Sequence, residues 1–336
     1  MNLEDKMTTD AITDKFKAAW WLPDGHSQTL WRKFSTTKTV HQRRQRVELD
    51  DGDFIDVDWA DAVSVNESKE KTIVFILHGL CGCSSSPYIL DLQALLNENG
   101  IASMAMNFRG CSGEINRLAR AYHSGVSEDL EEVFAKILAQ YPKHNFVFVG
   151  YSLGANVLLK WLGEIKGHPN IKKAIAVSTP FSLRNCSSAM LRGASQLYGK
   201  YFVRRLVADF SLKKSHFENI SEPTQAEHIG SLGDTRNISS IWEFDDKVTA
   251  PLHGYADAED YYDKCSSLGF LDAIGSDTLL IQSLNDPLIP RSSIPDKSSL
   301  AANVRLLLSH KGGHVGFISG SRQNWLEQKI LSFIQA

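Results

Sequence analysis

A serine set between two glycines is the strongest chemical signal in the sequence. Gly150-x-Ser152-x-Gly154 lies between an apolar, β-rich run at 145–149 and a helical pattern at 152–163. A sharp turn from strand to helix crowds the side chain at the turn, so the residues two before and two after it must be small. Such a turn lifts the hydroxyl clear of the sheet and places it at the positive end of a helix. The spacing predicts a nucleophilic serine rather than a simple helix cap.

A serine hydroxyl is a poor nucleophile until a base accepts its proton, and a histidine oriented by a carboxylate is the usual base. Six of the 11 histidines follow Ser152 in the chain. His314 lies in the segment KGGHVGF, where glycines allow the backbone to turn the imidazole toward the serine. We therefore predict His314 as the base. His310, two residues after a β-rich run, is the local alternative, and a purely structural loop histidine is the alternative without chemistry.

The carboxylate that orients the histidine is expected in the loop after the preceding strand. Asp286 follows the β-rich run at 277–283 and precedes His314, which matches the order serine, acid, histidine. The dipeptide Asp-Pro is also an ordinary turn signal, so the order in the chain carries this assignment. Four other acids are less well placed, namely Asp245, Asp246, Asp272 and Asp277.

Acyl transfer also needs two N–H groups that stabilise the negative oxygen of the tetrahedral intermediate. One is expected from Leu153, the residue after the nucleophile. The other is expected from the loop HGLCGCS after the strand at 72–77, where Gly79 permits an unusual backbone and Leu80 is the candidate donor. His78 is expected to hold this loop in place.

Strands and helices that could position these residues alternate along the chain. A β-hairpin is expected over Arg46–Trp59, around the turn sequence DDGD. Further strands are expected at 72–77, 101–107, 145–149, 172–177, 277–283 and 304–308, and helices at 86–99, 127–140 with Ser127 as N-cap, 152–163 and 322–334. This alternation predicts an α/β fold with a mostly parallel, doubly wound sheet.

One stretch interrupts the alternation. No buried-strand pattern occurs from about 180 to 269, and Ser187–Phe210 has a helical pattern with interleaved aromatic and basic residues. We expect a helical cap inserted between two sheet strands, above the strand ends where ligands bind in such sheets. The basic residues would suit an anionic ligand, but a solvated helix face is the commoner role. The 336 residues then form one catalytic domain, 1–336, with an N-terminal arm over 1–45.

Composition excludes several classes of protein. Hydrophobic residues make up 43% and charged residues 22%, as in globular rather than disordered chains. The 36 basic and 39 acidic side chains nearly cancel, so no nucleic-acid partner is expected. No apolar run is long enough to span a bilayer, although Phe16, Trp20 and Trp21 are compatible with weak peripheral contact with a membrane. Packing on the core is the commoner role for such aromatics.

The cysteines and the N-terminus indicate a cytoplasmic protein. The chain has an odd number of cysteines, Cys81, Cys83, Cys111, Cys186 and Cys265, with no Cys-x-x-Cys spacing. Reduced thiols are expected rather than disulfides or a metal site. The start, MNLEDK, lacks the pattern of a secretory signal. Nothing in the sequence calls for a cofactor, and the oligomeric state stays open.

Taken together, these motifs resemble the α/β-hydrolase superfamily. The shared motifs are His78-Gly79, NFRGCSG at 107–113, Gly150-x-Ser152-x-Gly154, Asp286-Pro287 and Gly313-His314. More closely, the chain resembles the YheT-like branch, which includes bacterial hydrolases and eukaryotic relatives that act on esters and phospholipids. The branch-like features are WLPDGHSQTL at 21–30, YHSG at 122–125, and FDDKVTAPLHG at 244–254 before Tyr261-Tyr262.

The resemblance spans roughly residues 15–335 and implies hydrolysis of carboxylic esters with short to medium acyl chains through a Ser152–Asp286–His314 triad. A small-molecule ester would be the substrate. Two alternatives use the same residues, namely a thioesterase and an acyltransferase that passes the acyl group to an alcohol. A third is a non-catalytic binding protein on the same scaffold, which an intact triad disfavours. Fold does not decide the substrate.

Overall fold

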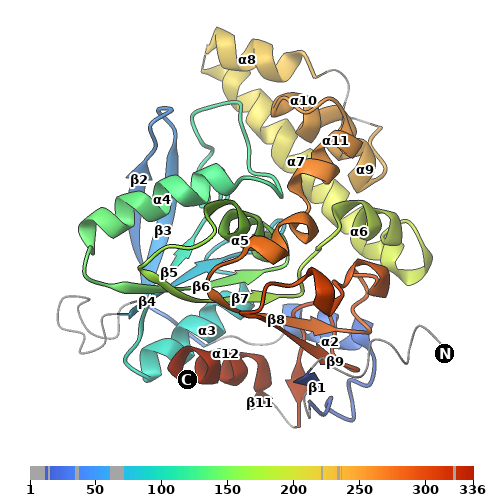
Figure 1. Ribbon diagram of the computed structural model, residues 1–336. Coiled ribbons are helices and arrows are strands. Elements are labelled where there is room, and N and C mark those ends of the chain that lie inside the picture. Colours follow the sequence, from blue (N-terminus) through green and yellow to red (C-terminus); the bar gives the residue numbers. More distant parts are fainter. Residues whose placement is uncertain are drawn as a thin grey trace.

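The computed structural model describes residues 12–13, 16–34, 38–60, 72–220, 222–232, 235, 237–320 and 323–336. A sheet runs through the middle of the molecule, with helices on both of its faces and a further group of helices beyond one end (Figure 1). The α/β architecture predicted from the alternating pattern is therefore confirmed.

The main sheet has the order β1-β9-β8-β7-β6-β4-β5-β3-β2 in the described part of the chain. Among the described strands of this sheet, the β2–β3 and β3–β5 pairs are antiparallel and the others are parallel, so the sheet is mostly parallel as predicted. Its strands are β1 (Ile12–Thr13), β2 (Arg43–Glu48), β3 (Phe54–Ala60), β4 (Thr72–Leu77), β5 (Ala102–Met106), β6 (Asn145–Tyr151), β7 (Ile171–Val177), β8 (Asp277–Ser283) and β9 (Val304–Ser309). β4 and β6 are almost wholly buried, which explains their continuous apolar sequences.

Helices cover both faces of the sheet (Figure 1). α4 (Ser127–Gln140) and α5 (Leu153–Ile165) lie on one face, and α3 (Pro87–Glu98) and α12 (Trp325–Gln335) lie on the other. Each pair closes a separate apolar core. Phe134, Phe148 and Trp161 belong to the first core, and Ile76 and Ile330 to the second.

The prediction that Ser127 caps α4 was wrong. Val126 occupies the N-cap position, and Ser127 is the first helical residue. Its hydroxyl accepts a hydrogen bond from Nζ of Lys160 at 2.9 Å instead of capping the helix. A contact with α5 therefore replaces the local one that the sequence suggested.

The N-terminal arm is built around α2 (Gly25–Phe34). Arg32 of α2 is buried and pairs with Asp91 of α3 at 2.6 Å and with Glu327 of α12. Burial raises the pKa of Glu327. Phe16 is also buried, whereas Trp20 is 88% exposed. Residues 1–11, 14–15 and 35–37 of the predicted arm, including the start considered for a signal, lie outside the described residues.

The segment between β7 and β8 is helical, as predicted, and its described residues contain no strand. Its helices are α6 (Leu183–Ala189), α7 (Gln196–Asn219), α8 (Pro223–Gly230), α9 (Ile241–Phe244), α10 (Ala250–Leu252) and α11 (Ala258–Cys265). We call this segment the cap helices. The helical pattern over Ser187–Phe210 is interrupted, because Gly193 adopts a left-handed φ of 52° between α6 and α7. No helix in the described residues has the length and apolarity needed to cross a membrane.

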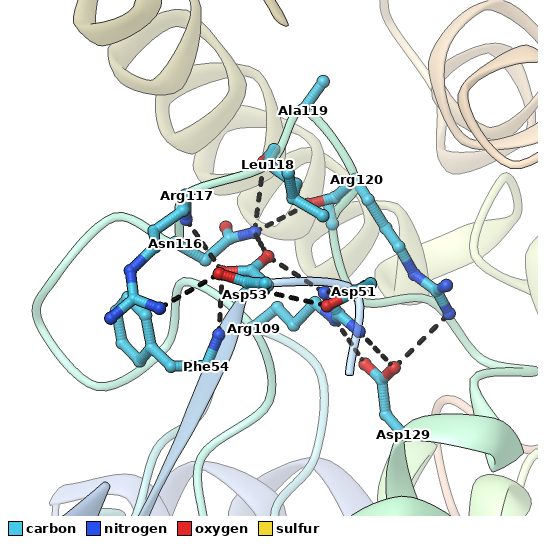
Figure 2. A network of polar contacts seen from close by, with 12 residues as sticks. Asp51, Asp53, Phe54, Arg109, Asn116, Arg117, Leu118, Ala119, Arg120 and Asp129 are labelled. Carbon is cyan, nitrogen blue, oxygen red and sulfur yellow. Dashed lines mark hydrogen bonds and ion pairs between the residues drawn. The ribbon is translucent and has the colours of Figure 1, made fainter. Parts of the chain in front are cut away.

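A buried guanidinium joins the hairpin turn, the loop after β5 and the start of α4 (Figure 2). Arg109 donates two 2.8 Å hydrogen bonds to Asp129 and one of 2.9 Å to Asp53. Asp53 also accepts from the side chain of Asn116 at 2.6 Å and from the backbone N–H of Arg117 at 2.8 Å. The long loop after β5 is therefore fixed by charge-assisted bonds.

Replacing Arg109 should be costly. Arg109→Met leaves the buried carboxylates of Asp53 and Asp129 without their main cation, and we expect the free energy of unfolding in urea to fall by about 3–5 kcal/mol. Lys38→Met is the control, because the Lys38–Glu98 pair is exposed and should contribute little. Equal losses in the two variants would contradict this role for Arg109.

Candidate active site

The strand-to-helix turn predicted at Ser152 is present. Ser152 lies between the end of β6 and the start of α5 and has a φ of 52°, a left-handed conformation that side chains other than glycine rarely adopt. A Cβ atom on Gly150 would lie 2.6 Å from Cα of Ala155, and one on Gly154 would lie 2.4 Å from the carbonyl oxygen of His78. Both positions therefore require glycine.

The structure brings Ser152, His314 and Asp286 together. His314 Nε2 lies 2.8 Å from Ser152 Oγ, and His314 Nδ1 lies 2.9 Å from the nearer carboxylate oxygen of Asp286. The Asp286 side chain is fully buried and also accepts the backbone N–H groups of Leu288 and Ile289. If His314 carries its proton on Nδ1 and donates it to the Asp286 carboxylate in a hydrogen bond, Nε2 is free to accept the serine proton.

None of the alternative residues takes the place of His314 or Asp286 in the described part of the chain. His310 is exposed and directly follows the last residue of β9. Asp277 pairs with Arg305, and Asp246 accepts the backbone N–H of Ala258. Asp245 has other partners and is described below.

The His314 loop is held by hydroxyl groups from distant parts of the chain. Thr29 Oγ1 of α2 accepts the backbone N–H of His314 at 2.8 Å, and Ser178 Oγ accepts that of Val315 at 3.0 Å. Val315 itself has a left-handed φ of 59°, so this loop needs such support. Sequence analysis assigned no role to Thr29, although it singled out the motif at 21–30 that contains it.

Two tyrosines hold the loop that carries Leu80. The Gly79 N–H donates to Tyr88 Oη at 2.9 Å, and the Cys81 N–H donates to Tyr122 Oη at 3.0 Å. The amides on both sides of Leu80 are thus occupied. The N–H groups of Leu80 and Leu153 have no acceptor within the described residues, and both residues line the cavity beside Ser152. Sequence analysis gave neither tyrosine this role, although Tyr122 begins the YHSG motif that it singled out.

His78 has the structural role predicted for it. Its Nδ1 donates to the carbonyl oxygen of Gly79 at 2.8 Å, and its Nε2 accepts the Phe108 N–H at 3.2 Å. Burial lowers the pKa of His78 to about 4, so the ring is neutral near pH 7 and can accept through Nε2.

A cavity opens beside Ser152 and His314. Most of its lining is apolar, and the cap helices supply much of it. The lining residues are Leu80, Ser124, Ser152, Leu153, Pro180, Leu183, Cys186, Ser187, Met190, Phe202, Ile241, Asp245, Tyr262, Leu288, Ile289 and His314. An uncharged, largely apolar molecule fits such a lining.

The described residues contain no group of histidine, cysteine and acidic side chains suited to hold a metal ion. All the cysteines are free thiols. Burial raises the pKa of Cys81 and of Cys186 to about 12, so both stay protonated and weakly nucleophilic near pH 7.

This fold and this arrangement of serine, histidine and aspartate define a class of hydrolases. The family model for the alpha/beta hydrolase fold matches residues 72–321. The chain therefore belongs to the α/β-hydrolase family, within its YheT-like branch.

Three relatives illustrate the match. The chain is 38% identical over 289 residues to "Putative esterase YheT" of Escherichia coli K12, covering 85% of this chain and 82% of that one. It is 28% identical to "Phospholipase ABHD3" of Homo sapiens, covering 97% of this chain and 80% of that one. Among solved structures, the Pyrococcus furiosus esterase Pf2001 has a TM-score of 0.55 at 14% identity, covers 89% of this chain and 97% of that chain, and shares the fold.

The turn at Ser152 should not tolerate a side chain at position 154. Gly154→Ala places a Cβ against the backbone oxygens of His78 and Leu77, and we expect it to reduce the free energy of unfolding by about 1–3 kcal/mol. Gly230→Ala is the matched control, because Gly230 lies at the end of α8 with nothing near its Cβ position. A Gly154→Ala protein as stable as Gly230→Ala would contradict the close contact.

Thr29 should support hydrolysis through the His314 loop. Thr29→Val keeps the shape but removes the acceptor of the His314 N–H, and we expect kcat to fall about 3–10-fold, equivalent to one hydrogen bond. Thr29→Ser keeps the hydroxyl and should behave almost as wild type. The assay is hydrolysis of p-nitrophenyl butyrate, with Tm measured in parallel. An unchanged kcat in Thr29→Val would exclude this role.

Proposed function

We propose that the protein hydrolyses carboxylic esters with short to medium acyl chains through an acyl-enzyme on Ser152. The observation that carries the proposal is the 2.8 Å contact between Ser152 Oγ and His314 Nε2, because this distance allows direct proton transfer. The largely apolar cavity beside the pair supports an acyl chain as the bound group. Relatives named as an esterase and a phospholipase also favour ester bonds.

In the first half of the reaction, Ser152 Oγ attacks the ester carbonyl while His314 Nε2 takes its proton. Asp286 holds the imidazole in the required tautomer and stabilises its charged form. The amides of Leu80 and Leu153 donate to the negative oxygen of the tetrahedral intermediate. The intermediate then collapses, and His314 returns the proton to the departing alcohol.

In the second half, a water molecule attacks the acyl-serine. His314 takes a proton from the water, the same two amides stabilise the second tetrahedral intermediate, and collapse releases the carboxylic acid and restores Ser152. An apolar cavity excludes bulk water and strengthens these charge interactions.

Removing the serine hydroxyl should abolish this reaction. We expect Ser152→Ala to lower kcat for p-nitrophenyl butyrate by at least about 10³-fold and to prevent labelling by a fluorophosphonate probe. Asp286→Asn should also lower kcat about 10³-fold or more, because the imidazole loses its orienting carboxylate. Identification of the free acid as the product separates hydrolysis from acyl transfer to an alcohol. Full turnover by Ser152→Ala would refute the proposal.

A further inference from the structure

The motif FDDKVTAPLHG at 244–254 has no role in the reaction described so far, yet part of it reaches the cavity. Asp245–Thr249 forms a π-helical turn between α9 and α10. Turns of this wide kind are uncommon and often occur at functional sites. Asp245, the first residue of the turn, lines the same cavity as Ser152 and His314.

Asp245 is anchored from two sides. Thr249 Oγ1 donates to one carboxylate oxygen at 2.8 Å, and Tyr262 Oη donates to the other at 2.7 Å. No basic side chain lies within ion-pair distance of it in the described part of the chain. Desolvation raises the pKa of Asp245 to about 6 despite these two hydrogen bonds. Each carboxylate oxygen keeps a second acceptor position.

Ser187 contributes a second polar group to the cavity lining. Its side chain is buried, and its Oγ lies near the hydroxyl of Tyr262 but makes no hydrogen bond of normal geometry with a described residue. A buried hydroxyl without a partner costs free energy, so a bound molecule that pairs with it gains by doing so. By contrast, Cys186, Leu288 and Ile289 form an apolar cluster that also lines the cavity.

We propose that Asp245 and Ser187 form a subsite for a hydroxyl group of the substrate, so that the preferred ester carries a hydroxyl in its alcohol or acyl part. This inference rests on the proposed ester hydrolysis. The substrate hydroxyl donates to Asp245 and accepts from Ser187 Oγ.

The inference separates two regions of the cavity. An acyl chain packs against Cys186, Leu288 and Ile289 without loss. The same chain against Asp245 would strip water from a carboxyl group and return no hydrogen bond. A substrate that lacks the hydroxyl leaves the polar groups of the subsite without a partner. The site therefore discriminates against it in favour of the hydroxylated ester.

Three esters that differ only in hydroxyl groups test this subsite. Propyl octanoate is the reference, 1-octanoylglycerol adds hydroxyls to the alcohol part, and propyl 3-hydroxyoctanoate adds one to the acyl part. We expect the wild-type kcat/KM for one hydroxylated ester to exceed that for the reference by about 10-fold or more. The ester that is preferred identifies the part of the substrate that reaches Asp245.

The variants tie this preference to the subsite. Asp245→Asn and Ser187→Ala should each lower the ratio of kcat/KM values at least about 3-fold. Asp246→Asn is the matched control, because the neighbouring Asp246 caps a backbone N–H instead of lining the cavity. Ser187→Ala is a small change that decides the question if Asp245→Asn fails to fold.

The outcomes separate this inference from the proposed function. Hydrolysis of all three esters at equal kcat/KM, or an equal fall of the ratio in Asp246→Asn, would overturn the subsite and leave ester hydrolysis standing. A wild-type protein that hydrolyses neither these esters nor p-nitrophenyl butyrate would overturn both.

Discussion

The left-handed backbone at Ser152 is the constraint on which the rest of the site depends. Ser152 can hold a φ of 52° only because β6 and α5 fix the chain on either side of it. Gly154 then packs directly against the carbonyl oxygen of His78, at the start of the loop that carries Leu80. The turn therefore sets the position of the serine and the position of the Leu80 amide at the same time.

Around this turn, the structure holds irregular loops mainly through hydroxyl groups that accept backbone N–H bonds. Tyr88 and Tyr122 do so for the Leu80 loop, and Thr29 and Ser178 do so for the His314 loop. Loops lack the regular partners of helices and strands, so their buried N–H groups need acceptors from elsewhere. The Arg109 network (Figure 2) has a related effect, because it fixes the loop after β5. Tyr122 belongs to the same loop.

The parts of the fold that sequence analysis predicted are those with a local signature. Apolar runs located the strands, and the glycines around Ser152 located the turn. The parts it missed depend on distant partners. Ser127 looks like a cap but bonds to Lys160 on another helix, and nothing near Thr29 or Tyr88 in the sequence reveals which N–H each will accept. The cavity lining could not be predicted from the sequence for the same reason, because its residues come from separate segments, many of them in the cap helices.

The bond between Thr29 and His314 joins residues 285 positions apart, so the beginning and the end of the chain meet at the active site. Bringing residues so far apart in the chain together lowers the chain entropy, and this loss opposes the contact until it is formed. Without the segment that contains His314, Ser152 has no base beside it. Any acyl-transfer chemistry of this protein therefore requires the chain to be folded through His314.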